Sequence, residues 1–211
     1  MKAIIFDLDG VIVSTDSLHY RAWKIMADGE NIYFDERIND RLRGVSRMES
    51  LEIILERASR TYTDEEKTAL ATKKNDIYRE LLQALTPDDR LDSVAETLEK
   101  LRAMGYKLAI GSSSRNTPLI LDKIGYKDYF DAVSDGNNIT RSKPDPQVFL
   151  MAADRLGFAP EECYVVEDAD AGIAAAKTGG FVAVSIGSAA HNPAADYKIV
   201  KFTELCDIVS K

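Results

Sequence analysis

The spacing of hydrophobic residues changes along the chain and divides it into segments. Residues 3–6 form a continuous apolar run that stops at Asp7, which is typical of a strand buried on both faces. From Ser17 the spacing becomes helical, with apolar residues every three or four positions. The expected apolar face consists of Leu18, Ala22, Ile25 and Met26. We therefore expect a short buried strand followed by a helix.

Two capping-box patterns predict further helices after this one. Ser46 is followed three residues later by Glu49, and Thr63 by Glu66. In such a pair each side chain hydrogen-bonds the backbone amide of the other residue at the start of a helix. The second box opens a long helix that runs toward Leu85. Because no strand pattern occurs between residues 15 and 84, we interpret this segment as an all-helical insert, too long for an ordinary loop and a candidate lid.

After Thr86-Pro87 the pattern alternates between strands and helices. A third capping box, Ser93 to Glu96, opens the first of these helices, and Gly105 ends it. The expected strands cover residues 107–111, 132–133, 164–166 and 181–186, and the expected helices cover 118–124, 146–156 and 171–177. This alternation predicts an α/β fold with a Rossmann-like parallel sheet covered on both faces. The expected domains are a core, residues 1–14 and 85–211, and a helical cap, residues 15–84.

Polar groups gather where the expected strands end. In open parallel sheets, active sites lie beyond the carboxyl ends of the strands. Three such ends carry reactive groups, namely Asp7-Leu8-Asp9-Gly10, Ser112-Ser113-Ser114 and Glu167-Asp168, and Lys143 lies between the last two in sequence. Each motif alone is more often a turn or a helix cap. Together, at successive strand ends, they favour one active site.

The residue types at these strand ends suit phosphoryl transfer. Four carboxylates in one crevice repel one another unless a cation is present, and oxygen ligands of this kind favour Mg²⁺. Asp7 and Asp9 lie two apart on an extended segment, so one can attack phosphorus while the other handles a proton. Serine hydroxyls and Lys143 supply hydrogen-bond donors and positive charge for phosphoryl oxygens.

These motifs resemble those of the haloacid dehalogenase superfamily. Phe6-Asp7-Leu8-Asp9-Gly10-Val11 is similar to its first motif, Ser112 to the second, Lys143-Pro144 to the third and Glu167-Asp168, continuing to Ile173, to the fourth. The resemblance spans essentially the whole chain. It implies a parallel-sheet core of the haloacid dehalogenase type with an inserted all-helical cap between the first two motifs.

Within this superfamily the chain is similar to mutases that interconvert β-glucose 1-phosphate and glucose 6-phosphate. The similar segments are residues 19–23, 42–47, 73–76 and 112–116. The resemblance implies that Asp7 is the nucleophile, which becomes an aspartyl-phosphate, and that Asp9 is the general acid and base. A bisphosphorylated sugar would be the intermediate. Thr15 and His19 would form a hinge that couples cap closure to Asp9.

The same resemblance implies the binding residues. Mg²⁺ would bind to Asp7, the backbone carbonyl of Asp9, Glu167 and Asp168. Arg47 would hold the phosphate that does not react. The substrate-binding residues would be Thr15, His19, Trp23, Arg43, Gly44, Val45, Ser46, Arg47, Lys74, Ser112, Ser113, Ser114, Arg115, Asn116 and Lys143. Trp23 is nevertheless better explained by packing within the cap, and without the resemblance Arg47 is better explained by a solvated charge at a helix start.

Two other functions are compatible with some of these features. A sugar-phosphate phosphatase would share all four core motifs, and only the cap residues favour a mutase. A phospho-acceptor such as a signalling receiver also combines acidic residues, a hydroxyl and a lysine on a parallel sheet. However, it is shorter, carries its acceptor on a later strand and has no helical insert. A binding protein without catalytic activity would not need Asp7, Asp9 and Lys143 together.

The composition narrows the choice of partners. The chain has 35 acidic and 27 basic residues, a net charge of −8, which disfavours binding to nucleic acid or an anionic membrane. No stretch reaches the length of a membrane span, and the N-terminus lacks a signal-peptide pattern. Cys163 and Cys206 are expected to be thiols in a strand and a terminal helix. We expect a cytoplasmic monomer acting on a small phosphorylated sugar.

Overall fold

The computed structural model describes residues 2–42 and 45–210. Contacts within the chain divide it into two compact units. Unit 1 consists of residues 1–14 and 86–211, and unit 2 of residues 15–85. Arg43 and Gly44, both expected to bind substrate, lie outside the described residues. The assignment of the units as catalytic core and cap stays a prediction.

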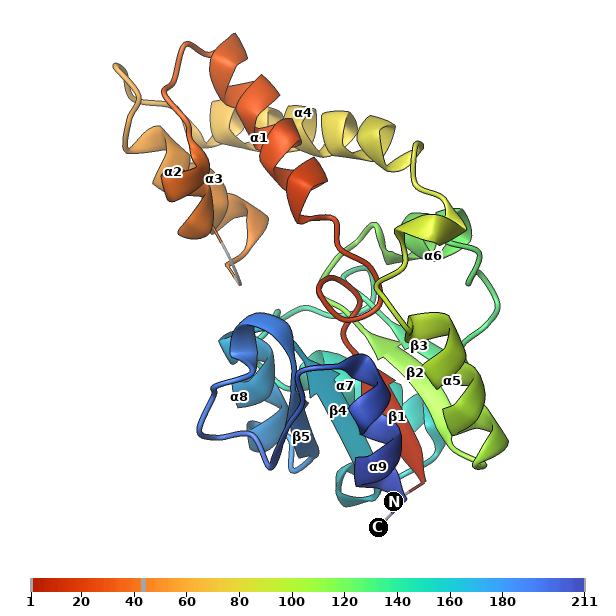
Figure 1. Cartoon of the computed structure of the whole chain (residues 1–211). Coiled ribbons are helices and arrows are strands. Elements are labelled where there is room, and N and C mark those ends of the chain that lie inside the picture. The colour runs from red at the N-terminus through yellow and green to blue at the C-terminus, as the bar shows by residue number, and fades with distance from the viewer. Residues whose placement is uncertain (1, 43–44, 211) are drawn as a thin grey trace. The chain divides into compact units, whose positions relative to one another are not determined.

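Unit 1 is built on a parallel β-sheet (Figure 1). Within the described residues it has six strands in the order β3-β2-β1-β4-β5-β6. The strands are β1 Ala3–Phe6, β2 Lys107–Gly111, β3 Ala132–Ser134, β4 Cys163–Glu167, β5 Val182–Ser185 and β6 Tyr197–Lys198. Central β1 pairs in parallel with both β2 and β4. This confirms the expected fold class, while the two-residue β6 was too short to produce a sequence pattern.

Helices cover both faces of this sheet. They are α5 Val94–Ala103, α6 Thr117–Lys123, α7 Gln147–Leu156, α8 Asp170–Thr178 and α9 Leu205–Val209, with short 3-10 helices η1 Pro87–Asp89, η2 Pro160–Glu162, η3 Gly187–Ala189 and η4 Phe202–Glu204. Ile5 of β1 packs in one buried cluster with Phe149 of α7 and Ile173 of α8. The next residue, Phe6, faces the other side, where its ring lies 5.8 Å from that of Phe202. Alternate residues of β1 thus enter two cores, which explains the unbroken apolar run.

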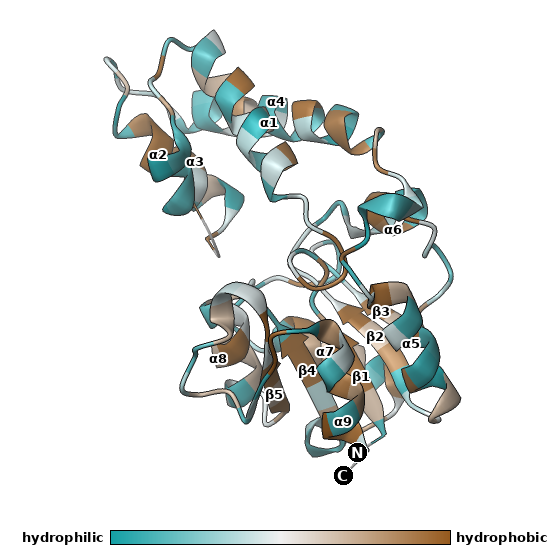
Figure 2. Ribbon diagram, in the orientation of Figure 1, coloured by the Kyte–Doolittle hydropathy of each residue, from teal (hydrophilic) through white to brown (hydrophobic). Residues whose placement is uncertain are grey.

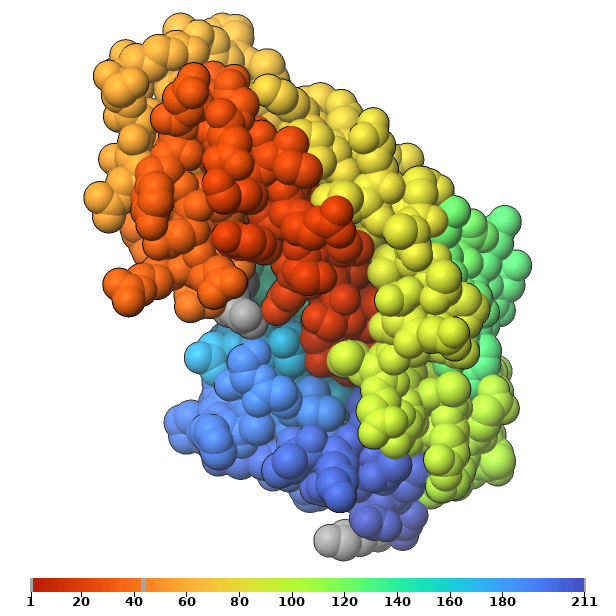
Figure 3. All heavy atoms as spheres, turned by 45° about the horizontal axis from the view of Figure 1, so that its top comes forward, coloured from red at the N-terminus to blue at the C-terminus, as the bar shows by residue number. Residues whose placement is uncertain are grey.

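The surface of unit 1 joins segments that are distant in sequence. Helix α9 packs beside α5, and in the space-filling view the blue C-terminal segment meets the yellow-green segment around α5 (Figure 3). Apolar residues are concentrated on the strands, whereas the outer sides of the helices are largely polar (Figure 2). Cys163 is buried in β4, Cys206 is half-buried in α9, and both are free thiols. None of the helices in the described residues is long and apolar enough to cross a membrane.

In the described residues of unit 2, the regular secondary structure is all helical. It consists of α1 Asp16–Gly29, α2 Glu36–Asp40, α3 Arg47–Leu55 and α4 Asp64–Leu82. The capping boxes predicted at Ser46 and Thr63 are both present, with each side chain bonded to the backbone amide of its partner. Helices α1 and α4 pack along each other. Their core includes Trp23, Met26 and Leu70.

Two local predictions were wrong. Ser93 adopts a left-handed backbone with φ of 61° and makes no capping hydrogen bond, although α5 does start at Val94. An N-cap needs an extended backbone to turn its hydroxyl toward the first amides, and a residue pattern does not reveal φ. Ile25 was expected on the buried face of α1 but is 48% exposed. Trp23 and Ala27 take its place in the core.

Candidate active site

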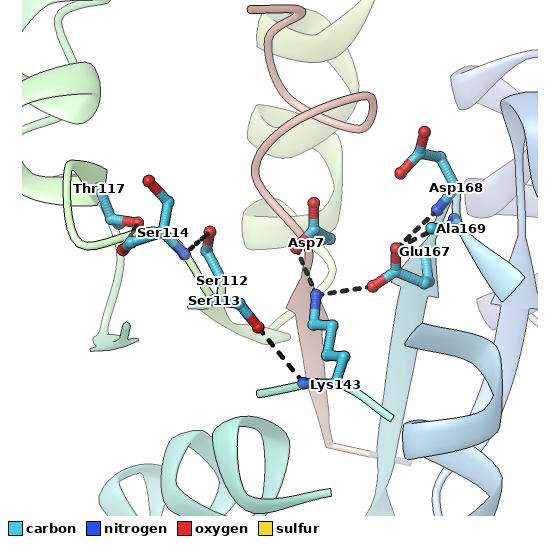
Figure 4. A network of polar contacts seen from close by, with 9 residues as sticks. All are labelled: Asp7, Ser112, Ser113, Ser114, Thr117, Lys143, Glu167, Asp168 and Ala169. Carbon is cyan, nitrogen blue, oxygen red and sulfur yellow. Dashed lines mark hydrogen bonds and ion pairs between the residues drawn. The ribbon is translucent and has the colours of Figure 1, made fainter. Parts of the chain in front are cut away.

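The sheet brings the three acidic or hydroxyl-rich strand ends together. Strands β2 and β4 flank β1 on either side, so Asp7, Ser112 and Glu167 lie at neighbouring strand ends (Figure 4). The amide of Asp7 continues the β-ladder by donating to the carbonyl of Val166 at 2.9 Å. The amide of Ser112 likewise donates to Ser134 at 3.0 Å. The hydrogen bonds of the sheet therefore fix the backbone positions of Asp7 and Ser112.

Three carboxylates form a compact oxygen cluster. One oxygen from each of Asp7, Glu167 and Asp168 lies within 4.8 Å of the others. Asp7 and Glu167 are buried, and Asp168 is half-buried. A set of carboxylate oxygens at a partly open edge suits Mg²⁺, which prefers oxygen ligands and keeps room for water and phosphate. The donor set therefore fits the expected ion.

Asp9 lies in a tight loop that follows β1. Within this loop the amide of Gly10 donates to the carbonyl of Val13 at 2.7 Å, and Asp9 itself forms a bridge with Val13. Gly10 has a left-handed backbone, and a Cβ atom there would lie 2.2 Å from the Asp168 carboxylate. Glycine is thus required by conformation and by close packing. The loop that carries Asp9 therefore lies against the Asp168 side chain.

Lys143 connects the cluster through its ammonium group. Its Nζ atom donates to Oδ1 of Asp7 and, at 2.7 Å, to Oε2 of Glu167. Burial alone would lower the pKa of Lys143, but the charges of Asp7 and Glu167 and the hydrogen bonds to them outweigh it, so the pKa lies above its ordinary value. Lys143 therefore stays positively charged beside the carboxylate expected to attack phosphorus.

Glu167 is held at the start of α8. Its Oε1 atom accepts hydrogen bonds from the amides of Asp168 at 3.2 Å and Ala169 at 3.1 Å. Burial raises the pKa of Glu167 to about 8, and the charges of Asp7 and Asp168 act in the same direction, against the opposing effect of Lys143. A Cβ atom on Gly172 would lie only 2.0 Å from this side chain. Gly172 was not among the predicted site residues, although it stands in the fourth motif.

The serine loop after β2 presents hydroxyl groups whose oxygens accept hydrogen bonds from backbone amides. Oγ of Ser112 accepts from the amide of Ser114 at 3.2 Å, and Oγ of Ser114 accepts from Asn116 at 3.1 Å. Oγ of Ser113 accepts from the amide of Lys143 at 3.5 Å. In each case the hydroxyl proton remains to be donated to an anion. The loop is thus suited to bind phosphoryl oxygens.

A second loop, residues 135–138, supports the serine loop from behind. The amide of Gly136 donates to the carbonyl of Ser114 at 3.2 Å, and Nδ2 of Asn137 donates to the carbonyl of Arg115 at 3.0 Å. A Cβ atom on Gly136 would lie 2.4 Å from the carbonyl oxygen of Ser113. Sequence reasoning missed this support because the contacts join loops that follow two different strands.

In unit 2, four of the predicted site residues gather around Tyr78. The hydroxyls of Thr15 and Tyr78 are 2.7 Å apart, and the ring of His19 stacks on Tyr78 with centroids 4.0 Å apart. Lys74 is only 3% exposed, and its Nζ atom lies 2.8 Å from Nδ1 of His19. The same Nζ lies 4.9 Å from the ring of Trp23. Tyr78 was not predicted, and its aromatic character alone indicated only packing.

Two electrostatic consequences follow for His19. Because an ammonium group can only donate, Nδ1 of His19 must be the acceptor from Lys74. Desolvation lowers the pKa of His19 well below its ordinary value, and the positive charges of Lys74 and Arg47 add to this effect. His19 is therefore neutral near pH 7.

Arg47 is the first residue of α3, where the capped helix start fixes its backbone. Its Nη2 atom donates to Oδ1 of Asn75 on α4 at 2.8 Å. Ser46 uses its hydroxyl to cap α3, since Oγ accepts from the amide of Glu49 at 3.3 Å. Val45, just before it, is 39% exposed. Arg47 is thus a positioned cation rather than a freely solvated one.

Comparison with known proteins places this geometry in a family. The family model described as haloacid dehalogenase-like hydrolase matches residues 1–180. The chain belongs to this family, as its motifs and sheet predicted.

Individual relatives have two kinds of activity in their names. The chain is 42% identical over 207 residues to a β-phosphoglucomutase of Bacillus subtilis, covering 97% of this chain and 92% of that protein. It is 32% identical over 183 residues to a fructose-1-phosphate phosphatase of Escherichia coli, covering 87% and 95% of the two chains. The crystal structure of a β-phosphoglucomutase from Clostridium difficile matches with a TM-score of 0.90 and 34% identity, covering 100% and 96%.

Proposed function

We propose that this chain interconverts β-D-glucose 1-phosphate and glucose 6-phosphate, the reaction of a β-phosphoglucomutase. The observation that carries the proposal is the similarity to the Bacillus subtilis enzyme, 42% identical over 97% of the chain. Support comes from the Lys143 ammonium beside Asp7 and Glu167 in unit 1 and from the positioned Arg47 in unit 2.

In the proposed mechanism Asp7 carries the phosphoryl group as an aspartyl-phosphate. The 6-hydroxyl of β-glucose 1-phosphate attacks this phosphorus while Asp9 takes the hydroxyl proton, and the bond to Asp7 breaks. The resulting 1,6-bisphosphate then presents its other phosphate. Asp7 attacks that phosphorus, the bond to the sugar oxygen at C1 breaks, and Asp9 returns the proton. Glucose 6-phosphate is released, and Asp7 is phosphorylated again.

The roles of the neighbouring groups follow the family resemblance, and their contacts support them. Lys143 aligns Asp7 and offsets negative charge on the transferring phosphoryl group. Ser112, Ser113 and Asn116 bind phosphate oxygens through the serine loop, and Arg47 binds a phosphate of the sugar. Mg²⁺ would be held by Asp7, Glu167, Asp168 and the backbone carbonyl of Asp9. When bound, the ion would neutralise charge that builds up on the phosphoryl oxygens.

The second candidate is a sugar-phosphate phosphatase of the same family. It is favoured by the similarity to the Escherichia coli fructose-1-phosphate phosphatase. A further relative, 30% identical, is a phosphorylated carbohydrates phosphatase of Thermotoga maritima. In such an enzyme water, rather than a sugar hydroxyl, would attack the aspartyl-phosphate. The two candidates therefore differ in the acceptor and not in the chemistry of Asp7.

Product analysis of three variants tests the proposal. Purified protein is given Mg²⁺, β-glucose 1-phosphate and a trace of the 1,6-bisphosphate, and glucose 6-phosphate and free phosphate are both measured. We expect Asp9→Ala to abolish isomerisation and Arg47→Ala to raise KM at least tenfold. Arg57→Ala, which removes an exposed arginine just beyond the same helix, is the matched control and should behave like wild type. Free phosphate as the main wild-type product would favour the phosphatase.

A further inference from the structure

The turn that follows β5 packs against the backbone of Glu167 and Asp168. The amide of Ile186 donates to the carbonyl of Glu167 at 3.0 Å, and the amide of Ala189 donates to that of Asp168 at 2.8 Å. Between them Gly187 has φ of 58°, a left-handed conformation that glycine adopts without strain. Ala189 is buried. The turn is thus anchored at both ends beside the carboxylate cluster.

Ser188, in the middle of this turn, reaches the Asp168 side chain. Its Oγ atom lies 2.9 Å from the carbonyl oxygen of Asp168 and 3.3 Å from the carboxylate oxygen Oδ2. The same oxygen also lies close to Gly10, where a Cβ atom would come within 2.2 Å of Oδ2. The carboxylate is thus confined by a hydroxyl group and by a bare glycine backbone.

This confinement matters because of what the cluster is expected to bind. Asp168 is half-buried, and without such neighbours its side chain could rotate toward water. Mg²⁺ requires near-octahedral geometry and therefore ligands held at fixed positions. Groups that hydrogen-bond a metal ligand from outside typically change metal affinity 10- to 100-fold when they are removed. A neutral hydroxyl donor can hold the carboxylate without competing for it as a cation would.

We propose that Ser188 is a positioning residue for Asp168, and that it sets the affinity of the Asp7, Glu167 and Asp168 cluster for a divalent cation. The inference rests on the metal site of the proposed function. It adds a residue outside the four motifs, twenty positions after the carboxylate it serves. Ser188 acts through Asp168 and does not contact the reacting atoms.

The test compares Ser188→Ala with Ser188→Thr, which keeps a hydroxyl group. The matched control is Ser210→Ala, since Ser210 is also an exposed serine whose hydroxyl bonds a backbone carbonyl, that of Cys206 at 2.6 Å. The dissociation constant for Mg²⁺ is measured by calorimetry without substrate, and the melting temperature without metal. We expect at least about tenfold weaker Mg²⁺ binding in Ser188→Ala, near wild-type binding in Ser188→Thr and Ser210→Ala, and similar melting temperatures.

Two outcomes would overturn the proposal. The first is that Ser188→Ala binds Mg²⁺ as tightly as wild type. In that case, a lower melting temperature of Ser188→Ala would show that Ser188 stabilises only the turn. A wild-type protein that binds no Mg²⁺ would remove its basis. Because the affinity is measured without substrate, a failure to isomerise sugar phosphates would defeat the proposed function and leave this inference standing. At saturating Mg²⁺, kcat of Ser188→Ala should return to within a few-fold of wild type.

Discussion

Nζ of Lys143 lies 2.7 Å from Oε2 of Glu167, and only 10% and 2% of the two side chains are exposed. The same ammonium group also contacts Asp7. One buried cation thus compensates two buried carboxylates. Among the described residues, no other lysine or arginine forms an ion pair with either carboxylate. Removing one member of such a group leaves buried charge uncompensated, which is strongly destabilising.

Lys143→Met is therefore expected to lower the free energy of unfolding of the metal-free protein by about 3–5 kcal/mol at pH 9. Lys100→Met removes a lysine from an exposed ion pair with Glu96 and should change the free energy of unfolding far less, because solvent screens such a pair. Urea unfolding monitored by circular dichroism measures both. Equal small effects would show that the Lys143 contacts contribute little to stability. Mg²⁺ should partly restore Lys143→Met, since it supplies the missing positive charge.

The raised pKa of Glu167 gives Mg²⁺ binding a definite dependence on pH. Burial brings this pKa to about 8, so below that pH the ion must displace a proton from Glu167. Affinity should rise by up to about tenfold per pH unit from pH 6 to 8 and level off above. The stability of the metal-free protein should change in the opposite sense. An acid with a raised pKa stabilises the folded state at low pH, and this contribution is lost as pH rises toward 8.

Calorimetric titration with Mg²⁺ at several pH values measures this dependence. Glu167→Gln, which has no proton to lose, is the control and should show a flatter profile over the same range. An equally steep profile in this variant would assign the proton to another group.

Gly172 is expected to tolerate no side chain. A Cβ atom there would lie 2.0 Å from the Glu167 carboxylate, so Gly172→Ala must displace a side chain that contacts both Lys143 and the start of α8. We expect activity and Mg²⁺ affinity to fall at least tenfold, with α8 retained because alanine favours helices. Gly29→Ala, at the end of α1, would meet only the flexible tip of Lys73 at 3.2 Å and serves as control. Steady-state kinetics and calorimetric Mg²⁺ titration compare the activity and the Mg²⁺ affinity of the two variants.

His19 should remain neutral under mildly acidic conditions. Its lowered pKa means that the folded state disfavours the charged imidazole, whereas the unfolded chain takes up a proton near pH 6.5. Stability is therefore present above that pH and is lost as pH falls below it. Nitrogen NMR at pH 6 should show a neutral His19 ring protonated at Nε2. The His19 signal is assigned from its absence in His19→Gln.

Lys74 contributes to this effect, and its removal should be visible in the same spectra. Lys74→Met takes away the charge 2.8 Å from Nδ1, so the pKa of His19 should rise toward its ordinary value. Lys73→Met changes the neighbouring, half-exposed lysine of the same helix and should leave the spectrum as in wild type. A charged His19 in the wild-type protein at pH 6 would contradict the assigned tautomer.

Much of the fold could be predicted because its signals are local. The apolar run at residues 3–6 marks a strand buried on both faces. All three predicted capping boxes precede a helix, and two of them form the capping hydrogen bonds. The box at Ser93 misled because side-chain identity does not determine φ. The two-residue β6 has no pattern of its own.

The candidate site likewise contains residues that the sequence predicted and residues that it did not. The rule that strand ends of a parallel sheet meet at one edge predicts from the sequence that Asp7, Ser112 and Glu167 lie together. It could not find Gly172 or Ser188, because their importance comes from how closely one atom approaches another. Contacts such as that between His19 and Lys74, 55 residues apart, depend on how α1 and α4 pack, and neither the residue pattern nor the family resemblance indicated them.

Phosphorus NMR tests whether the enzyme moves phosphate between two positions of one sugar. Wild-type protein is incubated with Mg²⁺, β-glucose 1-phosphate and a trace of the 1,6-bisphosphate, and all phosphorus signals are followed in one sample. For a mutase, we expect glucose 6-phosphate to replace the substrate while inorganic phosphate stays a minor product, and we expect Asp7→Asn to form neither glucose 6-phosphate nor inorganic phosphate. Steady release of inorganic phosphate without glucose 6-phosphate would contradict the mutase activity and identify a phosphatase.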